Sequence, residues 1–374
     1  MMKAKTIGLY VHIPFCVKKC AYCDFCSFIN TDFPEKSEYI EALCKEIDSY
    51  KNKGIALDTI FFGGGTPSLL SGDEFLKIVD HICSTFSISD NLEFTIEANP
   101  KTLTREKLSV YVSAGVNRVS LGLQSANQDE LSALGRIHNY DEFVESYLLI
   151  RECGIDNINV DLMYGIPEQT KDSFLSTLER VTKLSPEHIS VYGLILEEET
   201  PLYKSIDKYS IPTEDEECDM YYLAADFLRG AGYSHYEISN YAKKGYKCRH
   251  NLKYWRCEEY IGVGLSAHSY FDGKRFCNTN DRYAYLNDKC GIISLEECVN
   301  SDSLAYELVM LGLRLSDGFS RTEYENITGS DFFVGREKQI NKLIESGYLM
   351  VSGDRIALTE KGFYVSNTIL TELI

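Results

Sequence analysis

The stretch CVKKCAYCDFC, from Cys16 to Cys26, places four cysteines within eleven residues. It comes directly after the β-rich run TIGLYVHI at residues 6–13, so we expect the cysteines to lie on a loop at the end of a strand. Four thiolates would close a metal site and make it structural, whereas three would leave a position open for chemistry. The spacing of the cysteines therefore bears on both fold and function.

Cys16, Cys20 and Cys23 have the spacing C-x3-C-x2-C. Three thiolates can hold three irons of a cubane [4Fe–4S] cluster and leave the fourth iron without a protein ligand. The amino and carboxylate groups of S-adenosylmethionine (SAM) could chelate that iron, and a reduced cluster can then cleave the sulfonium to release a 5′-deoxyadenosyl radical. Zinc is the alternative, because the C-x2-C-x2-C spacing that ends at Cys26 also suits a zinc ion.

The composition is that of a globular protein with one large and one smaller domain: 374 residues, 44% hydrophobic and 25% charged. Most of the 13 cysteines are scattered singly, which favours a reducing cytoplasm. We expect no stable membrane insertion, because no apolar run approaches ~20 residues, and no export signal in MMKAKTIGLYVHIPFC. The net charge of −18 argues against nucleic acid as a partner.

Six β-rich runs alternate with helical stretches, two of which begin at the capping residues Ser71 and Thr170. Such succession predicts an α/β fold with a parallel sheet and right-handed crossovers. Six units are too few for an eight-fold barrel, so we expect an open, partial (β/α)6 TIM-like barrel whose chemistry lies at the carboxyl ends of the strands. The runs are residues 6–13, 58–65, 92–99, 117–124, 157–165 and 188–196.

The second half of the chain has a different character. A helix is predicted at 214–230, a tyrosine-rich β segment at 233–242 and a basic turn at 243–255. Residues 301–374 read as two or three helices followed by a hairpin at 348–359, which is typical of a winged-helix-like tail. DNA binding is not favoured for this tail, because its acidic residues outnumber its basic ones.

Several longer stretches carry a family resemblance, and they follow one another along nearly the whole chain. They are YVHIPFCVKKCAYCDF (10–25), FFGGGTPSLL (61–70), TIEANP (95–100), NRVSLGLQS (117–125), LGRIH (134–138), DLMYGIPEQT (161–170), YEISNYA (236–242), HNLKYW (250–255) and LGLRL around Arg314 (311–315). The chain resembles the radical SAM proteins of the oxygen-independent coproporphyrinogen III oxidase-like (HemN/HemW) family. The resemblance implies a radical SAM partial barrel at 1–232 and a HemN-type C-terminal α+β domain at 233–374.

The same resemblance assigns the cluster to Cys16, Cys20 and Cys23. It implies that the glycines of GGGTP receive the SAM amino group, which physically suits a turn whose backbone a ligand can approach closely. Carboxylates and amides suit ribose hydroxyls, and an arginine suits a carboxylate. The implied SAM contacts are Tyr10, Tyr22, Gly64, Gly65, Thr66, Glu97, Gln124, Arg136 and Asp161.

The family contains two functions. One is an enzyme, a coproporphyrinogen III dehydrogenase-type oxidoreductase that decarboxylates propionates with a SAM-derived radical, and the other is a chaperone that binds haem and delivers it to an acceptor protein. The oxidases carry a fourth cysteine where this chain has Phe25, and they have a longer segment before the cluster than the 15 residues found here. These departures favour the haem chaperone and make Cys26 a bystander, while enzyme activity stays open.

His250 opens HNLKYW, a motif that resembles the one associated with haem binding in HemW-like proteins. An imidazole can ligate haem iron, and Tyr254 and Trp255 could stack on the macrocycle. His268 is a second candidate ligand. The basic run of Lys243, Lys244, Lys247 and Arg249 could meet haem propionates or could be a solvated turn. The expected partners are haem or a related tetrapyrrole, a haem-accepting protein and a reductant for the cluster.

Overall fold

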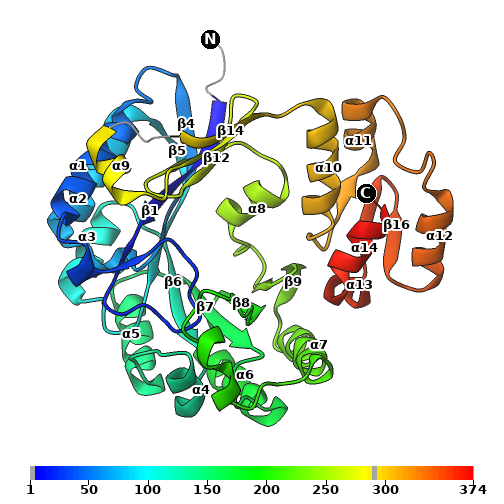
Figure 1. The fold of residues 1–374 in the computed structure, drawn as a ribbon, viewed down its shortest axis with the longest axis horizontal. Coiled ribbons are helices and arrows are strands. Elements are labelled where there is room, and N and C mark those ends of the chain that lie inside the picture. Colours follow the sequence, from blue (N-terminus) through cyan, green and yellow to red (C-terminus); the bar gives the residue numbers. More distant parts are fainter. Residues whose placement is uncertain (1–4, 289–292, 374) are drawn as a thin grey trace.

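The computed structural model describes residues 5–288 and 293–373 (Figure 1). Residues 1–4 belong to the segment MMKAKTIGLYVHIPFC, in which no export signal is predicted, and they lie outside the described residues. The outer ends of the two predicted domains, at residues 1–4 and 374, lie outside them as well. Among the residues described, no helix is long and apolar enough to cross a membrane.

The predicted parallel sheet is confirmed. Its six strands lie side by side in chain order, each parallel to the next. In the described part of the chain, the strand order continues past β1 and past β8, and these two strands are not neighbours in the sheet, which fits the predicted partial barrel. The strands are β1 (Lys5–Ile13), β4 (Ile55–Gly64), β5 (Ser87–Ala98), β6 (Arg118–Gln124), β7 (Asn157–Tyr164) and β8 (His188–Gly193).

Helices between these strands and after β8 cover the outer face of the curved sheet (Figure 1). Both predicted caps are present, since Ser71 caps α2 and Thr170 caps α6 with full capping boxes. The helices are α1 (Lys36–Asp48), α2 (Gly72–Thr85), α3 (Arg105–Ser113), α4 (Gln128–Ala133), α5 (Tyr140–Glu152), α6 (Lys171–Leu184) and α7 (Glu214–Gly230).

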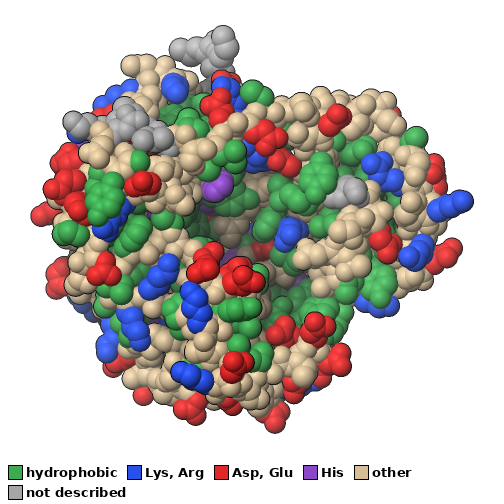
Figure 2. Space-filling model, in the orientation of Figure 1, with side chains coloured by type: hydrophobic (Ala, Val, Ile, Leu, Met, Phe, Trp, Pro, Cys, Tyr) green, Lys and Arg blue, Asp and Glu red, His purple; other side chains and the backbone are tan. Residues whose placement is uncertain are grey.

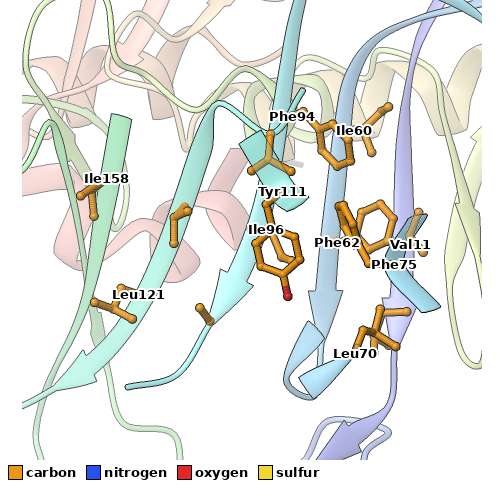
Figure 3. Packing of buried hydrophobic residues seen from close by; sticks show 14 of the residues in the cluster. Val11, Ile60, Phe62, Leu70, Phe75, Phe94, Ile96, Tyr111, Leu121 and Ile158 are labelled. Carbon is orange, nitrogen blue, oxygen red and sulfur yellow. The ribbon is translucent and has the colours of Figure 1, made fainter. Parts of the chain in front are cut away.

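The main core lies between the sheet and these helices (Figure 3). Phe62 and Phe94, from neighbouring strands, pack on Phe75 of α2, whose ring centroid lies 4.6 Å from that of Tyr111 on α3. Each such buried aromatic contributes roughly 1.5–3 kcal/mol through apolar burial. This packing fixes the strands, and with them the side chains that alternate toward the barrel interior.

Residues after α7 extend the sheet at both edges. The strands β9 (Ser234–Glu237) and β10 (Asn240–Ala242) add to β8, and β11 (Tyr260–Val263), β12 (His268–Phe271), β13 (Lys274–Asn278) and β14 (Ile293–Cys298) add to β1. The helix α9 (Arg282–Asp288) follows β13 and precedes β14 in the chain. The boundary at 232/233 stays a prediction, although strands on both sides of it share one sheet.

The basic turn predicted at 243–255 is wrong in its second half, because Arg249–Trp255 forms the helix α8. Cys248 precedes the helix and gives no side-chain cap. Instead, the carboxylate of Glu93 accepts hydrogen bonds from the backbone N–H groups of Arg249 at 2.9 Å and His250 at 3.0 Å. A carboxylate suits a helix N-terminus, because it accepts hydrogen bonds from the free backbone N–H groups there. Glu93 is far from α8 in the sequence, so the local sequence did not reveal this helix start.

The C-terminal part matches the predicted winged-helix-like pattern of helices followed by a hairpin. It contains α10 (Ser301–Gly312), α11 (Arg321–Thr328) and α12 (Glu337–Glu345), then the hairpin of β16 (Leu349–Ser352) and β17 (Arg355–Leu358). The short β15 (Phe319–Ser320) pairs with β17, and two further helices end the described chain, α13 (Glu360–Tyr364) and α14 (Ser366–Leu373). These elements pack around a second hydrophobic core, to which Tyr221 of α7 also contributes.

Candidate cluster and cofactor site

A cavity of about 470 Å³ lies at the carboxyl ends of the parallel strands. We call it the cysteine cavity, because Cys16, Cys20 and Cys23 all line it. Most of the predicted SAM contacts line it as well: Tyr22, Gly64, Gly65, Thr66, Glu97, Gln124, Arg136 and Asp161. Tyr10 does not, because its side chain lines a second cavity on the other side of the cysteine loop.

Each of the three thiols lies near a hydrogen-bonding group. The hydroxyl of Thr66 donates to Cys16 Sγ at 3.8 Å, Arg136 Nη1 donates to Cys20 Sγ at 3.4 Å, and Ser27 Oγ lies 4.0 Å from Cys23 Sγ. Hydrogen bonds to sulfur stabilise metal-bound thiolates and tune a cluster's potential. Burial raises the pKa of the Cys16 and Cys23 thiols.

His12 anchors the end of the cysteine loop. Its Nε2 lies 2.8 Å from the carbonyl oxygen of Cys26, and its Nδ1 lies 3.0 Å from the hydroxyl of Tyr10. Burial lowers the pKa of His12, so the ring is neutral and has one N–H. That N–H belongs on Nε2, since only a donor can bond a carbonyl, and Nδ1 then accepts from Tyr10. Cys26 lines the second cavity and not the cysteine cavity.

The GGGTP turn packs directly against this loop. Gly64 has a φ of +110°, and a Cβ there would lie 2.5 Å from the His12 ring. A Cβ on Gly65 would lie 2.7 Å from the Phe15 carbonyl oxygen. Both positions therefore require glycine, the first for conformation and space and the second for space. The turn bonds the same segment, since Thr66 N donates to the Phe15 carbonyl at 2.7 Å.

Arg136 joins the cysteine loop to neighbouring strand ends. Besides Cys20, its guanidinium donates from Nη2 to Asn99 Oδ1 at 2.5 Å and to the Gly122 carbonyl at 2.8 Å. Asn99 in turn donates to the hydroxyl of Thr66 at 2.9 Å. A half-buried cation on the cavity wall can meet a carboxylate, and the assignment of Arg136 to the SAM carboxylate stays a prediction.

Two acidic side chains lie deeper in the cavity. Glu97 accepts a hydrogen bond from the backbone N–H of Gly64 at 3.2 Å, and burial together with the nearby Asp161 raises its pKa to about 8. Asp161 accepts from Ser120 Oγ at 3.1 Å and from Asn159 Nδ2 at 2.7 Å, and burial raises its pKa as well. Carboxyl groups held in this way can bond hydroxyls of a ligand.

The sequence did not reveal four polar residues whose side chains hydrogen-bond the predicted SAM contacts: Asn99, Ser120, Asn159 and Tyr192. Asn99 lies inside the TIEANP motif, two residues after Glu97, so strand-end position was a usable signal. Tyr192 donates to Gln124 Oε1 at 2.9 Å, and Gln124 has a φ of +72°. Nothing in a single sequence indicates such cross-strand partners, because they follow from the register of the sheet.

Within the described residues, no group of three His, Cys, Asp or Glu side chains is placed to hold a single metal ion. The three cysteines instead line one cavity, with donors beside them, which fits a polynuclear cluster. A partial parallel (β/α) barrel with such a loop after its first strand defines a radical SAM protein. The family models agree: the radical SAM superfamily matches residues 10–181, and the HemN C-terminal domain matches residues 299–365.

Similarity to curated proteins extends over the full chain. "Heme chaperone HemW" of Buchnera aphidicola subsp. Schizaphis graminum is 37% identical, covering 99% of each chain, and that of Escherichia coli K12 is 36% identical, covering 99% of this chain and 98% of its own. The chain therefore belongs to the HemW family of radical SAM proteins. Membership in the radical SAM superfamily implies a [4Fe–4S] cluster and SAM.

The solved structure of the Escherichia coli coproporphyrinogen III oxidase HemN, a radical SAM enzyme, has the same fold. The TM-score is 0.86 at 22% identity, with 99% of this chain and 90% of that chain covered. The similarity confirms the predicted architecture, including its C-terminal part.

Of the three predicted haem contacts, His250 and Tyr254 are hydrogen-bonded to each other, but the three do not line one cavity. His250 is 1% exposed, and both ring nitrogens have protein partners, Thr59 Oγ1 at 2.8 Å from Nδ1 and the Tyr254 hydroxyl at 2.8 Å from Nε2. Burial lowers its pKa to about 3. Tyr254 lines the second cavity, but Trp255 lines neither cavity and packs near Arg314.

The basic run is largely engaged with the protein itself. Lys243 Nζ donates to the Ser185 carbonyl at 2.7 Å, Lys247 lies over the ring of Tyr236, and Arg249 donates to the Asn91 carbonyl. These contacts engage three of the four basic side chains with the protein, and propionate binding by this run stays a prediction.

Proposed function

We propose that this protein is a cytoplasmic haem chaperone that holds a [4Fe–4S] cluster and SAM in the cysteine cavity and delivers haem to an acceptor protein. The observation that carries the proposal is full-length similarity to proteins named haem chaperone at 36–37% identity, against 22% to the oxidase. Phe25 supports it, because it stands where the oxidases have a further cysteine.

The residues of the cysteine cavity fit the cluster and SAM. Cys16, Cys20 and Cys23 would hold the cluster, which supplies one-electron chemistry when bound. Arg136 would bind the SAM carboxylate, the GGGTP turn would receive the amino group, and Glu97 and Asp161 would bond ribose hydroxyls. Gly64 and Gly65 line the cavity without a side chain, which supports this arrangement because a ligand can approach their backbone closely. A reductant would supply the electron.

The test is anaerobic reconstitution of the cluster followed by two parallel assays. In one, the protein is titrated with haem and the Soret band is followed. In the other, it is incubated with coproporphyrinogen III, SAM and a reductant. We expect saturable haem binding, and haem release to an added apo-haemoprotein, without protoporphyrinogen. Protoporphyrinogen formation with SAM turnover would instead establish the oxidase function.

A further inference from the structure

The second cavity, with a volume of about 830 Å³, lies on the opposite side of the cysteine loop from the cysteine cavity. Asp24 and Phe25 line both cavities, so this loop is their common wall. The volume falls within the roughly 300–1,000 Å³ typical of cofactor sites. Figure 2 shows that this side of the molecule is hollowed between the barrel and the C-terminal elements, with hydrophobic side chains and a histidine in the hollow.

Aromatic side chains form much of the wall of the second cavity. Tyr10, Tyr254 and Tyr260 line it from the barrel side, and Phe25 and Phe28 line it from the cysteine loop. Phe25 is 69% exposed and lines both cavities, so its ring is accessible to a bound molecule. Flat apolar walls of this kind suit a macrocycle, and Lys19, also on the wall, can pair with a carboxylate.

His268 is the histidine best placed to ligate a metal in this cavity. It begins β12, lines the second cavity and is the exposed one among the seven histidines. The next residue, Ser269, faces inward and donates to the Gly262 carbonyl, so strand alternation turns His268 outward. No hydrogen bond links the His268 ring to another described residue, whereas both nitrogens of His250 are occupied.

We propose that haem binds in the second cavity with His268 as its axial ligand, and that His250 acts as a positioning residue. This inference rests on the proposed haem function. Neutral imidazole is a natural ligand of haem iron, and exposure leaves the His268 ring free to coordinate. His250 would contribute by holding the hydroxyl of Tyr254, a wall residue, through the 2.8 Å hydrogen bond between that hydroxyl and its Nε2.

The two roles make different spectroscopic predictions. Loss of an axial ligand changes the Soret position and the spin state of ferric haem, whereas loss of a positioning residue lowers affinity and leaves the coordination unchanged. The experiment titrates the full-length, cluster-reconstituted protein with haem and records absorption and EPR spectra. The variants are His268→Ala, His250→Ala and, as a matched control, His81→Ala, whose ring bonds Asp48 on the outer helices. Thermal unfolding checks that each variant is folded.

We expect His268→Ala to lose the wild-type haem spectrum, to weaken binding about tenfold or more, and to regain the spectrum when free imidazole is added. His250→Ala should keep the wild-type coordination with weaker binding, and His81→Ala should behave as the wild type. A wild-type spectrum in His268→Ala would overturn the inference, as would its loss in folded His250→Ala alone. Failure of the wild type to bind haem would instead overturn the proposed function.

Discussion

Gly64 lies where the GGGTP turn meets the cysteine loop, and its replacement by alanine tests how the two are coupled. A residue with a Cβ at a φ of +110° costs about 1–3 kcal/mol in backbone strain. The Cβ would also lie 2.5 Å from the His12 ring, and overpacking of this kind costs about another 1–3 kcal/mol. We therefore expect Gly64→Ala to lower the free energy of unfolding by about 4 kcal/mol.

Gly115→Ala is the matched control. Gly115 has a φ of +94°, but a Cβ there would meet nothing within 4 Å. Only the backbone strain remains, so the free energy of unfolding should fall by about 2 kcal/mol. His12 also bonds the Cys26 carbonyl, so a displaced ring loosens the cysteine loop. Gly64→Ala should therefore lose iron on reconstitution, whereas Gly115→Ala should keep it.

The assay is denaturant unfolding of both variants and of the double variant Gly64→Ala/His12→Ala, combined with iron analysis. Removing the ring relieves the clash, so the double variant should be about 2 kcal/mol more stable than the sum of the single effects. Additive single effects, or equal losses at Gly64 and Gly115, would refute the reasoning.

Three further substitutions probe charged side chains that the protein holds by hydrogen bonds. Glu93→Gln replaces the carboxylate at the N-terminus of α8, so the free energy of unfolding should fall by about 2 kcal/mol in denaturant unfolding. An unchanged midpoint would contradict this role of Glu93. In Arg136→Lys, the lysine cannot donate to Cys20, Asn99 and Gly122 at the same time. Equilibrium dialysis should therefore show SAM binding at least about tenfold weaker, with the cluster iron retained. An affinity for SAM equal to that of the wild type would exclude a direct role of Arg136. Burial raises the pKa of Glu46 from 4.5 to about 7, so its contribution should lower the free energy of unfolding by about 3 kcal/mol as the pH rises from 4.5 to 7. Glu46→Gln should remove that part of the pH slope, and an unaltered slope would show that the carboxyl is not the source.

The parts of this fold that could be predicted are those determined by residues close together in the sequence. Parallel strands buried on both faces appear as apolar runs, and helices covering them begin at caps such as Ser71 and Thr170. The cysteine cavity was predictable for the same reason, because parallel strands bring their carboxyl ends to one edge and thus unite Cys16, Glu97 and Asp161.

The parts that could not be predicted depend on contacts between distant segments. The helix α8 begins because Glu93 accepts its backbone N–H groups, from more than 150 residues away. That helix turns His250 into the barrel and gives both its nitrogens partners, while the alternation of β12 exposes His268. Motif spacing names both histidines but carries no information on which of them is free to bind a ligand.

The most direct test of the account is the EPR spectrum of the reduced, reconstituted cluster with and without SAM, measured for the wild type and for single cysteine variants. The account predicts that SAM changes the spectrum of the wild type and of Cys26→Ala, and that both contain four irons per chain. It also predicts that alanine at Cys16, Cys20 or Cys23 abolishes the cluster. Loss of iron in Cys26→Ala, or a spectrum that SAM leaves unchanged, would contradict a cluster held by three cysteines with one iron open to SAM.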